Sequence, residues 1–466
     1  MNSHTGREMM NIKDFKNIYF VGIGGIGMSA IARYFKAIGK NVYGYDKTQT
    51  LLTGELEKEG IGIVFNDGIQ QIPEIYLNKE ETLVVYTPAI PSNHEQLTFF
   101  KKKNFLLMKR AQVLGFLSDP LNGVGIAGTH GKTTVSSLTA HIFKSSALDC
   151  NAFLGGISRN YNTNLLLSKT SPWVVLEADE FDRSFLQLHP QVAVVTSMDA
   201  DHLDIYGKKE ELEKTFQDYV RQIKKGGHLV HKKGLPLKPS DVNLYSYSLE
   251  EEADFYAKNL KLVQGLYQFD LVHPEGCIEG LKLSYPGRIN VENAIAASAV
   301  ALICGVSQDE LRFALNNFKG VRRRFDYRIK SENLVFIDDY AHHPKELWES
   351  ISSVKAIYPN KKITGIFQPH LYTRTRDFAD GFAESLDLLD EIILLDIYPA
   401  RELPIEGISS NLILDKMTKK GRICSKEELI EQIEQSEIEV LLTLGAGDID
   451  KLVEPLEHAM NQRIKC

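Results

Sequence analysis

The fold of this chain is decided by the stretch GVGIAGTHGKTTVSSLTAHIF, residues 123–143. An apolar run comes first, a glycine-rich turn follows, and amphipathic helical sequence continues from Lys132. This order is typical of a phosphate-binding loop, in which backbone N–H groups surround phosphates, the lysine reaches the terminal phosphates and a hydroxyl holds Mg²⁺. Ile126 replaces the first glycine of the standard motif, so the loop is a variant. The pattern predicts an ATP site on Gly128, Thr129, His130, Gly131, Lys132, Thr133 and Thr134.

Another glycine loop, the first along the chain, lies near the N-terminus, so the loop at Lys132 is the second. GIGGIG, residues 22–27, follows the apolar run NIYFV and opens a helical stretch, and Asp46 ends the next predicted strand. This is the dinucleotide fingerprint, in which glycines let the backbone approach a diphosphate at a helix N-terminus. Alone it favours a nicotinamide oxidoreductase, but it does not separate NAD from other nucleotide diphosphates. The loop at Lys132 argues against an oxidoreductase, which has no use for a γ-phosphate site.

Acidic side chains crowd the ends of two further predicted strands. WVVLEADEFD carries Glu177, Asp179, Glu180 and Asp182, and VAVVTSMDADHLD carries Asp199, Asp201, His202 and Asp204. Mg²⁺ takes oxygen ligands and keeps several waters, so one or two carboxylates suffice to bind it. Most of these acids are therefore expected to have other roles, and His202 is either a ligand or an ordinary hydrogen-bonded histidine.

Apolar runs alternate with helical stretches along the whole chain, which predicts an α/β protein with parallel sheets. Three blocks are expected, at residues 11–117, 118–320 and 321–466. The first and third resemble Rossmann-like domains, and the second is a P-loop ATPase-type sheet in which residues 253–285 look like a small β insertion. In the third block, DDYAHHP, FQPH, YPA and GAGD put polar residues where strands end, which is where open sheets bind ligands.

Bulk composition excludes several classes of function. The 466 residues carry a net charge of −7, which argues against a general nucleic-acid binder. No apolar run reaches the roughly 18–20 residues that cross a bilayer, and the N-terminus lacks the apolar core of a secretory signal. The five cysteines are scattered, as expected for free thiols in a reducing cytoplasm. We expect a cytoplasmic protein without a membrane or nucleic-acid partner, either a monomer or a weak homodimer.

Two polar groups near the second block boundary remain open to interpretation. Arg322, Arg323 and Arg324 are either a solvated charge run or a linker cluster that reaches phosphate when domains close. We expect Asn290 to act as a helix N-cap and Asn293 to recognise adenine through its amide.

Ten motifs together resemble the Mur ligases, the ATP-dependent amide-forming enzymes of peptidoglycan assembly. In chain order they are GIGGIGM, AGTHGKTT, EADEFDRSFL, DADHLDIYG, NVENAIAA, GVRRRFD, DDYAHHP, FQPHLYTRT, YPAREL and GAGD. FQPHLYTRT and YPAREL resemble the branch that joins L-alanine to UDP-N-acetylmuramate. The alternative is the recycling branch, which attaches a whole murein tripeptide to the same sugar nucleotide. A regulatory P-loop ATPase without ligation is a further alternative, but the polar strand ends of the third block argue for another substrate.

The resemblance implies an N-terminal UDP-binding domain, a central ATPase domain and a C-terminal amino-acid-binding domain. It implies ATP and Mg²⁺ as cofactors and an acyl phosphate intermediate. The catalytic residues it implies are Lys132, Glu177, His202 and Arg324. In addition to the loop at Lys132, ATP would contact Asn293 and Arg324. Metal ligands would be Thr133, Glu177 and His202. UDP-sugar contacts would be Gly24, Gly25, Ile26, Gly27, Met28, Asp46 and Arg110. Amino-acid contacts would be Tyr340, His342, His370 and Arg374, and either His342, His343 or His370 would assist amine deprotonation or position the amino acid.

Three departures from the family pattern bear on these roles. Leu371 stands where an arginine is common near the amino-acid carboxylate, which moves that role to Arg374. Ile289 replaces a common histidine near ATP, and FNDGIQQI lacks the usual glycine-histidine pair of the first domain.

Overall fold

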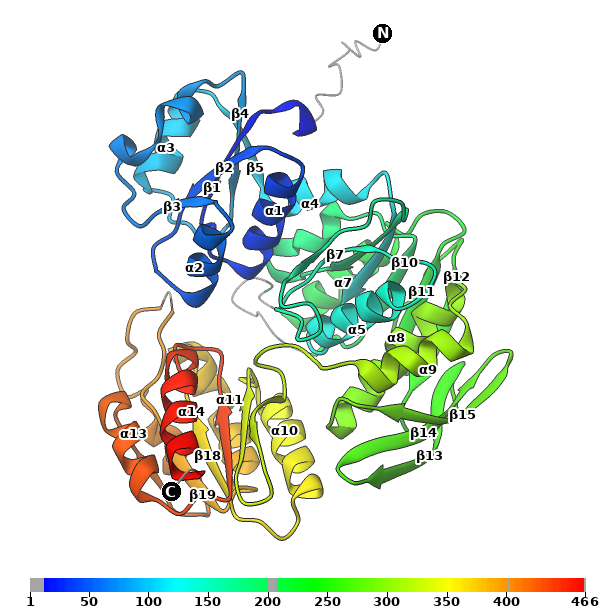
Figure 1. The fold of residues 1–466 in the computed structure, drawn as a ribbon, viewed down its shortest axis with the longest axis vertical. Coiled ribbons are helices and arrows are strands. Elements are labelled where there is room, and N and C mark those ends of the chain that lie inside the picture. The colour runs from blue at the N-terminus through cyan, green and yellow to red at the C-terminus, as the bar shows by residue number, and fades with distance from the viewer. Residues whose placement is uncertain (1–11, 200–205, 207, 401, 465–466) are drawn as a thin grey trace. The chain divides into compact units, whose positions relative to one another are not determined.

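The computed structural model describes residues 12–199, 206, 208–400 and 402–464 (Figure 1). The chain divides into two compact units. Unit 1 contains the chain up to Tyr256 together with Ile295–Ala314, and unit 2 contains Ala257–Ala294 and the chain from Leu315 onward. Three sheets organise these units, so the predicted α/β class with parallel sheets is confirmed. Among the described residues, no helix combines the length and apolar composition needed to cross a bilayer.

Unit 1 begins with a parallel five-stranded sheet in the order β3-β2-β1-β4-β5. Its strands are β1 (Asn17–Val21), β2 (Asn41–Tyr45), β3 (Gly62–Val64), β4 (Thr82–Tyr86) and β5 (Leu106–Lys109). Its helices are α1 (Ile26–Ala37), α2 (Leu51–Lys58), α3 (Glu95–Lys102) and α4 (Arg110–Ser118). Every residue of β1 is buried, as expected for a central strand covered on both faces.

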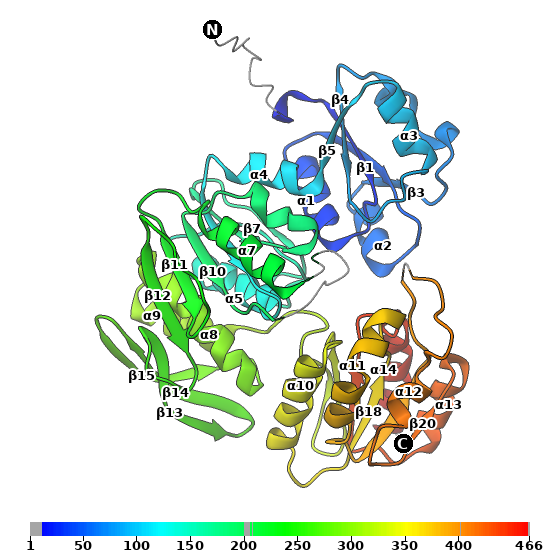
Figure 2. The same cartoon turned by 180° about the vertical axis from the view of Figure 1, so that it is seen from behind.

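The second sheet, in its unit 1 part, has the order β12-β11-β10-β6-β9-β7-β8, and of these strands only β8 runs antiparallel to its neighbour. Figure 2 shows β10, β11 and β12 side by side. Its strands are β6 (Asn122–Ala127), β7 (Asn151–Phe153), β8 (Leu165–Leu166), β9 (Trp173–Glu177), β10 (Val192–Val195), β11 (His228–Lys232) and β12 (Asn243–Ser248). The helices are α5 (Lys132–Lys144), α7 (Lys209–Val220) and α9 (Gln308–Asn317). One apolar core joins this sheet to the first, with Phe20, Phe35, Leu176 and Phe216 among its members. Helix α5 is buried from Thr133 to Phe143, which fixes the loop that precedes it.

The predicted β insertion is confirmed as three strands, β13 (Phe255–Val263), β14 (Leu266–His273) and β15 (Gly276–Leu283). The first residues of β13 pair with β12, and β14 and β15 form an antiparallel hairpin. The helix α8 (Arg288–Ile303) follows.

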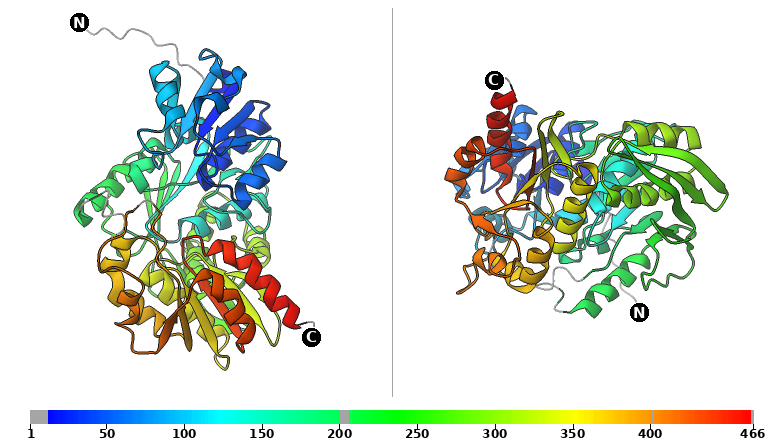
Figure 3. Two further views of the ribbon diagram at one scale, coloured as in Figure 1. Left: turned by 90° about the vertical axis from the view of Figure 1, so that its left-hand side faces the viewer. Right: turned by 90° about the horizontal axis from the view of Figure 1, so that it is seen from below.

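The rest of unit 2 is a six-stranded sheet in the order β16-β17-β21-β18-β19-β20, parallel except for β16. Its strands are β16 (Asp326–Lys330), β17 (Val335–Asp339), β18 (Ile363–Phe367), β19 (Glu391–Leu394), β20 (Gly421–Ile423) and β21 (Val440–Leu444). The helices are α10 (Pro344–Ile357), α11 (Tyr372–Leu386), α12 (Asn411–Leu414), α13 (Lys426–Gln435) and α14 (Asp450–Ile464). Helix α14 lies along the sheet (Figure 3) and contributes Val453, Leu456 and Met460 to its core.

Candidate active site

The phosphate loop of unit 1 connects β6 to α5, as its sequence predicts. Gly131 caps α5 with φ +83°, a left-handed conformation that favours glycine. Gly128 has φ +136°, and a Cβ there would lie 2.0 Å from the Thr196 hydroxyl oxygen. The unpaired N–H groups of the first turn of α5 therefore begin directly after a loop that tolerates no side chain at Gly128, an arrangement suited to phosphate.

Hydrogen bonds fasten this loop to the end of β10. The Thr129 hydroxyl lies 2.9 Å from the Ser197 hydroxyl and accepts a hydrogen bond from the Asp199 backbone N–H at 3.1 Å. The backbone N–H of His130 donates to the Ser197 hydroxyl at 2.8 Å, and its imidazole Nε2 lies 3.6 Å from an Asp199 carboxylate oxygen. The backbone of His130 is thus hydrogen-bonded to Ser197, and its imidazole ring faces the carboxylate of Asp199.

Lys132 begins α5 and forms a buried ion pair with Glu180. Its ammonium donates to the Gly128 carbonyl at 2.6 Å and to Glu180 Oε1 at 2.9 Å. Burial lowers the pKa of Lys132, but Glu180, Asp179 and Glu177 outweigh burial and raise the pKa above its usual value. Lys132 therefore stays charged, as phosphate binding requires. Glu180 is fully buried, and the Tyr206 hydroxyl donates to its backbone carbonyl.

The first glycine loop opens α1 in the predicted way. Gly25 is the N-cap of α1, and the backbone N–H of Gly24 donates to Asp46 Oδ2 at 2.7 Å. The contact with Asp46 closes the loop onto the end of β2. Met28 is buried in the core, whereas Gly25 is exposed. A Cβ at Gly27 would lie 2.5 Å from an Arg110 guanidinium nitrogen, so Arg110 reaches the helix start because position 27 is glycine.

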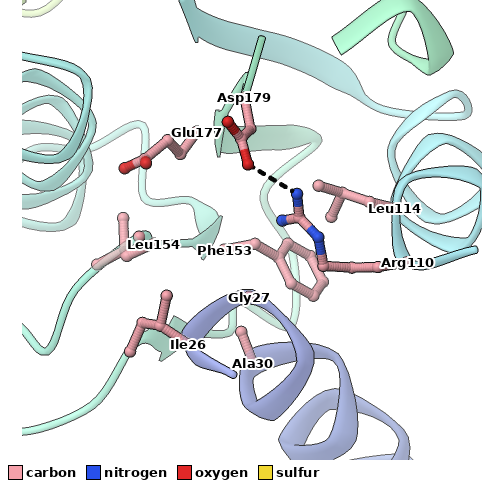
Figure 4. A pocket seen from close by; sticks show the side chains of 10 residues that line it. Ile26, Gly27, Ala30, Arg110, Leu114, Phe153, Leu154, Glu177 and Asp179 are labelled. Atoms are coloured by element: carbon pink, nitrogen blue, oxygen red, sulfur yellow. Dashed lines mark hydrogen bonds and ion pairs between the residues drawn. The ribbon is translucent and has the colours of Figure 1, made fainter. Parts of the chain in front are cut away.

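A pocket lies between this loop and the acidic end of β9 (Figure 4). Ile26, Gly27 and Ala30 of α1 form one side, and Glu177 and Asp179 face them. The other lining residues are Arg110, Leu114, Phe153, Leu154 and Gly155. The Arg110 guanidinium donates to Asp179 Oδ2 at 3.1 Å, as the dashed line in Figure 4 marks. The pocket therefore combines a helix N-terminus and an arginine with two carboxylates, a suitable environment for an anionic ligand held beside a cation.

Residues 177–182 include a feature that the sequence did not reveal. Both glycine loops contact this acidic segment, because Glu177 and Asp179 line the pocket of the first loop while Glu180 binds Lys132 of the second. Asp182 and Arg183 both adopt left-handed backbone conformations, which turn the chain after β9. From the sequence, Glu177 was chosen as the catalytic acid among four acidic residues. Only the path of the chain after β9 reveals that Glu180 faces Lys132.

The predicted metal ligands Thr133 and Glu177 are hydroxyl and carboxylate oxygens, a donor set that suits Mg²⁺. His202, with Asp201 and Asp204, lies outside the described residues. Within the described part of the chain, no cluster of three His, Cys, Asp or Glu side chains could hold a metal by itself. Mg²⁺ commonly binds through one or two protein groups together with substrate phosphates, so this donor set fits the ion.

In unit 2, one structural expectation for the asparagines is wrong. Asn290 lies within the first turn of α8 and not before it, because the helix already begins at Arg288. Its amide donates to the Pro286 carbonyl at 2.6 Å and its oxygen accepts from Asn293 at 3.2 Å. Asn290 therefore does not act as an N-cap, and it orients Asn293 instead.

The predicted amino-acid residues of unit 2 gather at the carboxyl ends of β17 and β18. The guanidinium carbon of Arg324 lies over the Tyr340 ring, 4.9 Å from the ring centroid. The ring of His342 lies 5.2 Å from Tyr340 and 6.1 Å from His370 between centroids. Arg374 is buried on α11, which begins after Leu371 with its unusual φ of +69°. Four of the residues singled out by sequence therefore occupy one end of this sheet.

His342 is held in its neutral form. Burial lowers its pKa to about 4, against the opposing influence of Glu346. Its Nδ1 lies 3.0 Å from the Tyr340 carbonyl, which can only accept, so Nδ1 carries the proton and Nε2 carries the lone pair. Glu346 also accepts from the His342 backbone N–H at 3.1 Å, a contact that no motif indicated.

The neighbouring His343 has a structural role. It is the N-cap of α10, and its Nδ1 accepts from the Lys345 backbone N–H at 3.3 Å. The ring of His370 stacks on Tyr398 at 5.8 Å. Of the three histidines predicted to assist the amine or position the amino acid, His343 thus uses its ring to cap its own helix.

Three family models cover nearly the whole chain. "Mur ligase family, catalytic domain" matches residues 17–120, "Mur ligase middle domain" matches 126–301 and "Mur ligase, glutamate ligase domain" matches 323–447. The UDP-N-acetylmuramate–L-alanine ligase of Parabacteroides distasonis is 52% identical over 98% of this chain and 100% of its own length. The chain belongs to the Mur ligase family. The ligase of the same name from Phocaeicola vulgatus is 49% identical over 97% of this Mur ligase and all of its own length.

Solved structures agree with this family membership. The UDP-N-acetylmuramate-alanine ligase of Thermotoga maritima matches with a TM-score of 0.83 and 27% identity, over 96% of this Mur ligase and 99% of that chain. A murein peptide ligase from Psychrobacter arcticus has a TM-score of 0.69 at 21% identity, over 96% and 98% of the chains, which shows a shared fold. Family membership removes both the nicotinamide oxidoreductase and the regulatory ATPase from the alternatives.

Proposed function

We propose that this Mur ligase uses ATP to join L-alanine to the carboxylate of UDP-N-acetylmuramate, a step in peptidoglycan precursor synthesis. The observation that carries the proposal is the acidic segment at the end of β9, which contacts Lys132 of one glycine loop and lines the pocket of the other. Two phosphate-binding loops around one acidic segment would let one nucleotide phosphorylate a substrate that is linked to another. Full-length relatives at about half identity carry the alanine ligase name, which supports the choice of amino acid.

Each loop would hold one nucleotide. The second loop and Lys132 would bind the β- and γ-phosphates of ATP, with Asn293 and Arg324 as further contacts. The first loop and Arg110 would bind UDP-N-acetylmuramate, with the diphosphate at the N-terminus of α1. Because both nucleotides are cytoplasmic metabolites, we propose the same compartment for the enzyme.

Mg²⁺ would be held by Thr133, Glu177 and His202, and it would neutralise phosphate charge. The chain's own contribution is electrostatic, because Lys132 remains charged beside the γ-phosphate. The muramoyl carboxylate can then attack the γ-phosphorus, ADP departs, and an acyl phosphate forms. Phosphate is a far better leaving group than the original carboxylate oxygen.

The second step uses the residues of unit 2. Arg374 would bind the alanine carboxylate, and Tyr340, His342 and His370 would surround the amine. The α-amino group of free alanine is mostly charged at neutral pH, so it must lose a proton before it attacks. Neutral His342, with its lone pair on Nε2, is the residue we propose to accept a hydrogen bond from that ammonium and to orient it while one of its protons passes to solvent water. The amine then attacks the acyl carbon and phosphate leaves.

Isotope transfer tests this chemistry directly. UDP-N-acetylmuramate labelled with ¹⁸O in its carboxylate, incubated with ATP and L-alanine, should yield inorganic phosphate that carries one ¹⁸O for each amide formed. Mass spectrometry of both products measures the label. Amide formed with unlabelled phosphate would contradict the acyl phosphate, and absence of any amide would contradict the ligase.

A further inference from the structure

Asn164 joins the two sides of the pocket between the glycine loop and β9. It lies immediately before β8 and is completely buried. Its amide Nδ2 donates to the Ile26 carbonyl at 2.6 Å and to the Ser29 hydroxyl at 2.9 Å, both in the first turn of α1. The backbone carbonyl of Asn164 accepts from the Leu154 backbone N–H at 2.9 Å. Ile26 and Leu154 both line the pocket, so one residue connects its two sides.

The orientation of the Asn164 amide is determined by Arg33. The Arg33 guanidinium, whose side chain is 6% exposed, donates to Asn164 Oδ1 at 2.5 Å and is itself anchored by Glu59 at 2.7 Å. Because arginine can only donate, the Asn164 oxygen must face Arg33 and the NH₂ group must face α1. Both polar atoms of the side chain are thus used, and aspartate, which lacks the NH₂ donors, cannot reproduce this pattern.

The contacted turn of α1 supplies the backbone N–H groups proposed to bind diphosphate. On the other side, Leu154 and Gly155 adjoin Glu177, and a Cβ at Gly155 would lie 2.0 Å from Glu177 Oε2. We infer that Asn164 is a positioning residue that sets the distance between the sugar-nucleotide cradle on α1 and the carboxylates at the end of β9. The inference rests on the proposed function, since it concerns how the muramoyl carboxylate is placed for phosphoryl transfer.

The test compares full-length variants by steady-state kinetics. For Asn164→Ala and Asn164→Asp, kcat/KM for UDP-N-acetylmuramate should fall by about 10²-fold, because displacements of the order of 1 Å impair reactant alignment to that extent. KM for ATP should change less than about twofold, because the side-chain hydrogen bonds of Asn164 go to α1 and not to the loop at Lys132. A purely structural residue would not separate the two substrates in this way.

Asn151→Ala is the matched control. Asn151 lies on β7 of the same sheet, where its oxygen accepts from the Ser168 N–H at 3.0 Å and its amide donates to the Trp173 carbonyl at 3.3 Å. It loses similar hydrogen bonds, none of which goes to α1, so its kcat/KM should stay within about threefold of the wild type after correction for folded protein. Equal losses in the Asn164 and Asn151 variants, or a parallel rise in KM for ATP, would overturn the inference.

Ser29→Ala provides a milder variant in case the Asn164 variants do not fold. It removes one acceptor of the Asn164 amide from a buried site and should raise KM for UDP-N-acetylmuramate about threefold, the effect of one modest hydrogen bond. An unchanged KM would contradict the inference. Failure of the proposed function would be distinct from failure of this inference. If the proposed function were wrong, the wild type itself would show no alanine-dependent turnover.

Discussion

Lys132 and Glu180 form a buried ion pair at the start of α5, and this pair has two separable consequences. Lys132→Met should reduce ATP-dependent phosphate release by at least about 10²-fold, since a charged contact to the γ-phosphate is lost. It should also destabilise the fold by about 3 kcal/mol, because Glu180 would be left as an uncompensated buried charge. Coupled phosphate release and urea denaturation measure the two effects.

The double variant Lys132→Met/Glu180→Gln separates them. Neutralising Glu180 should recover most of the lost stability and none of the activity. Lys144→Met, at the other end of the same helix, should keep its activity within about twofold of the wild type. Recovery of activity in the double variant would contradict the role given to Lys132.

His141 on α5 is predicted to make stability depend on pH. Burial lowers its pKa from 6.5 to about 4, so below pH 6.5 the unfolded chain binds a proton that the native state excludes. Its contribution to stability is fully present above pH 6.5 and is lost as the pH falls toward 4. Between pH 6.5 and pH 5 the loss should be about 1.6 kcal/mol.

His141→Asn, which keeps a polar group beside the Tyr161 hydroxyl, removes this titration. The difference in unfolding free energy between pH 6.5 and pH 5, measured by urea denaturation, should be smaller in the variant by that amount. Identical pH dependence of variant and wild type would exclude His141 as its source.

Single residues were predictable from sequence where a local motif defines them. The loop around Lys132 depends on neighbours in sequence, so its glycines and hydroxyls were identified directly. Asn164 belongs to no motif, and its partner Arg33 is 131 positions away, so only the fold brings them together. The choice between Glu177 and Glu180 likewise depends on the path of the chain after β9, which composition does not encode.

At the scale of elements, the connection between β6 and α5 depends on Gly128. Gly128→Ala would place a Cβ against the end of β10 at a positive φ, so the loop must shift. We expect kcat/KM for ATP to fall by about 10²-fold through misplacement of the loop. Gly54→Ala is the control, because that position in α2 is open and alanine favours a helix. Its activity should be unchanged and its stability slightly increased, and a Gly128 variant that matched it would contradict the steric argument.

The two adjacent histidines at the start of α10 are predicted to have different roles, His343 in stability and His342 in binding L-alanine. His343→Ala removes the helix cap and should lower the free energy of unfolding by about 1 kcal/mol, with KM for L-alanine unchanged. His342→Ala should raise KM for L-alanine about tenfold, as expected for a lost hydrogen bond to an ammonium group. Thermal unfolding and alanine titrations distinguish the two. A larger KM effect at His343 would reverse the assignment.

Element types were largely predictable because apolar runs and glycine turns alternate so regularly. LVFIDDYAHHP, for example, gave β17 and the start of α10 from its pattern alone. Boundaries were harder, since the prediction began α8 too late and so misplaced Asn290. The helix starts at Arg288 after Gly287, whose φ of +98° makes the turn.

At the scale of the whole molecule, the sites proposed for the two nucleotides use loops of unit 1, and the residues proposed for alanine belong to unit 2. Either glycine loop alone suggested a different class of protein, because each loop reports on one nucleotide and neither shows that the two serve one reaction. The UDP assignment of the first loop required the family motifs, because an NAD-binding loop has the same local physics.

The central claim is a reaction that needs both nucleotides and one particular amine. Its most direct test is phosphate release from ATP in the presence of UDP-N-acetylmuramate, with L-alanine and the murein tripeptide added in parallel. We predict release that requires L-alanine and is not supported by the tripeptide. Release that depends on the tripeptide alone, or that proceeds without any amine, would contradict the account.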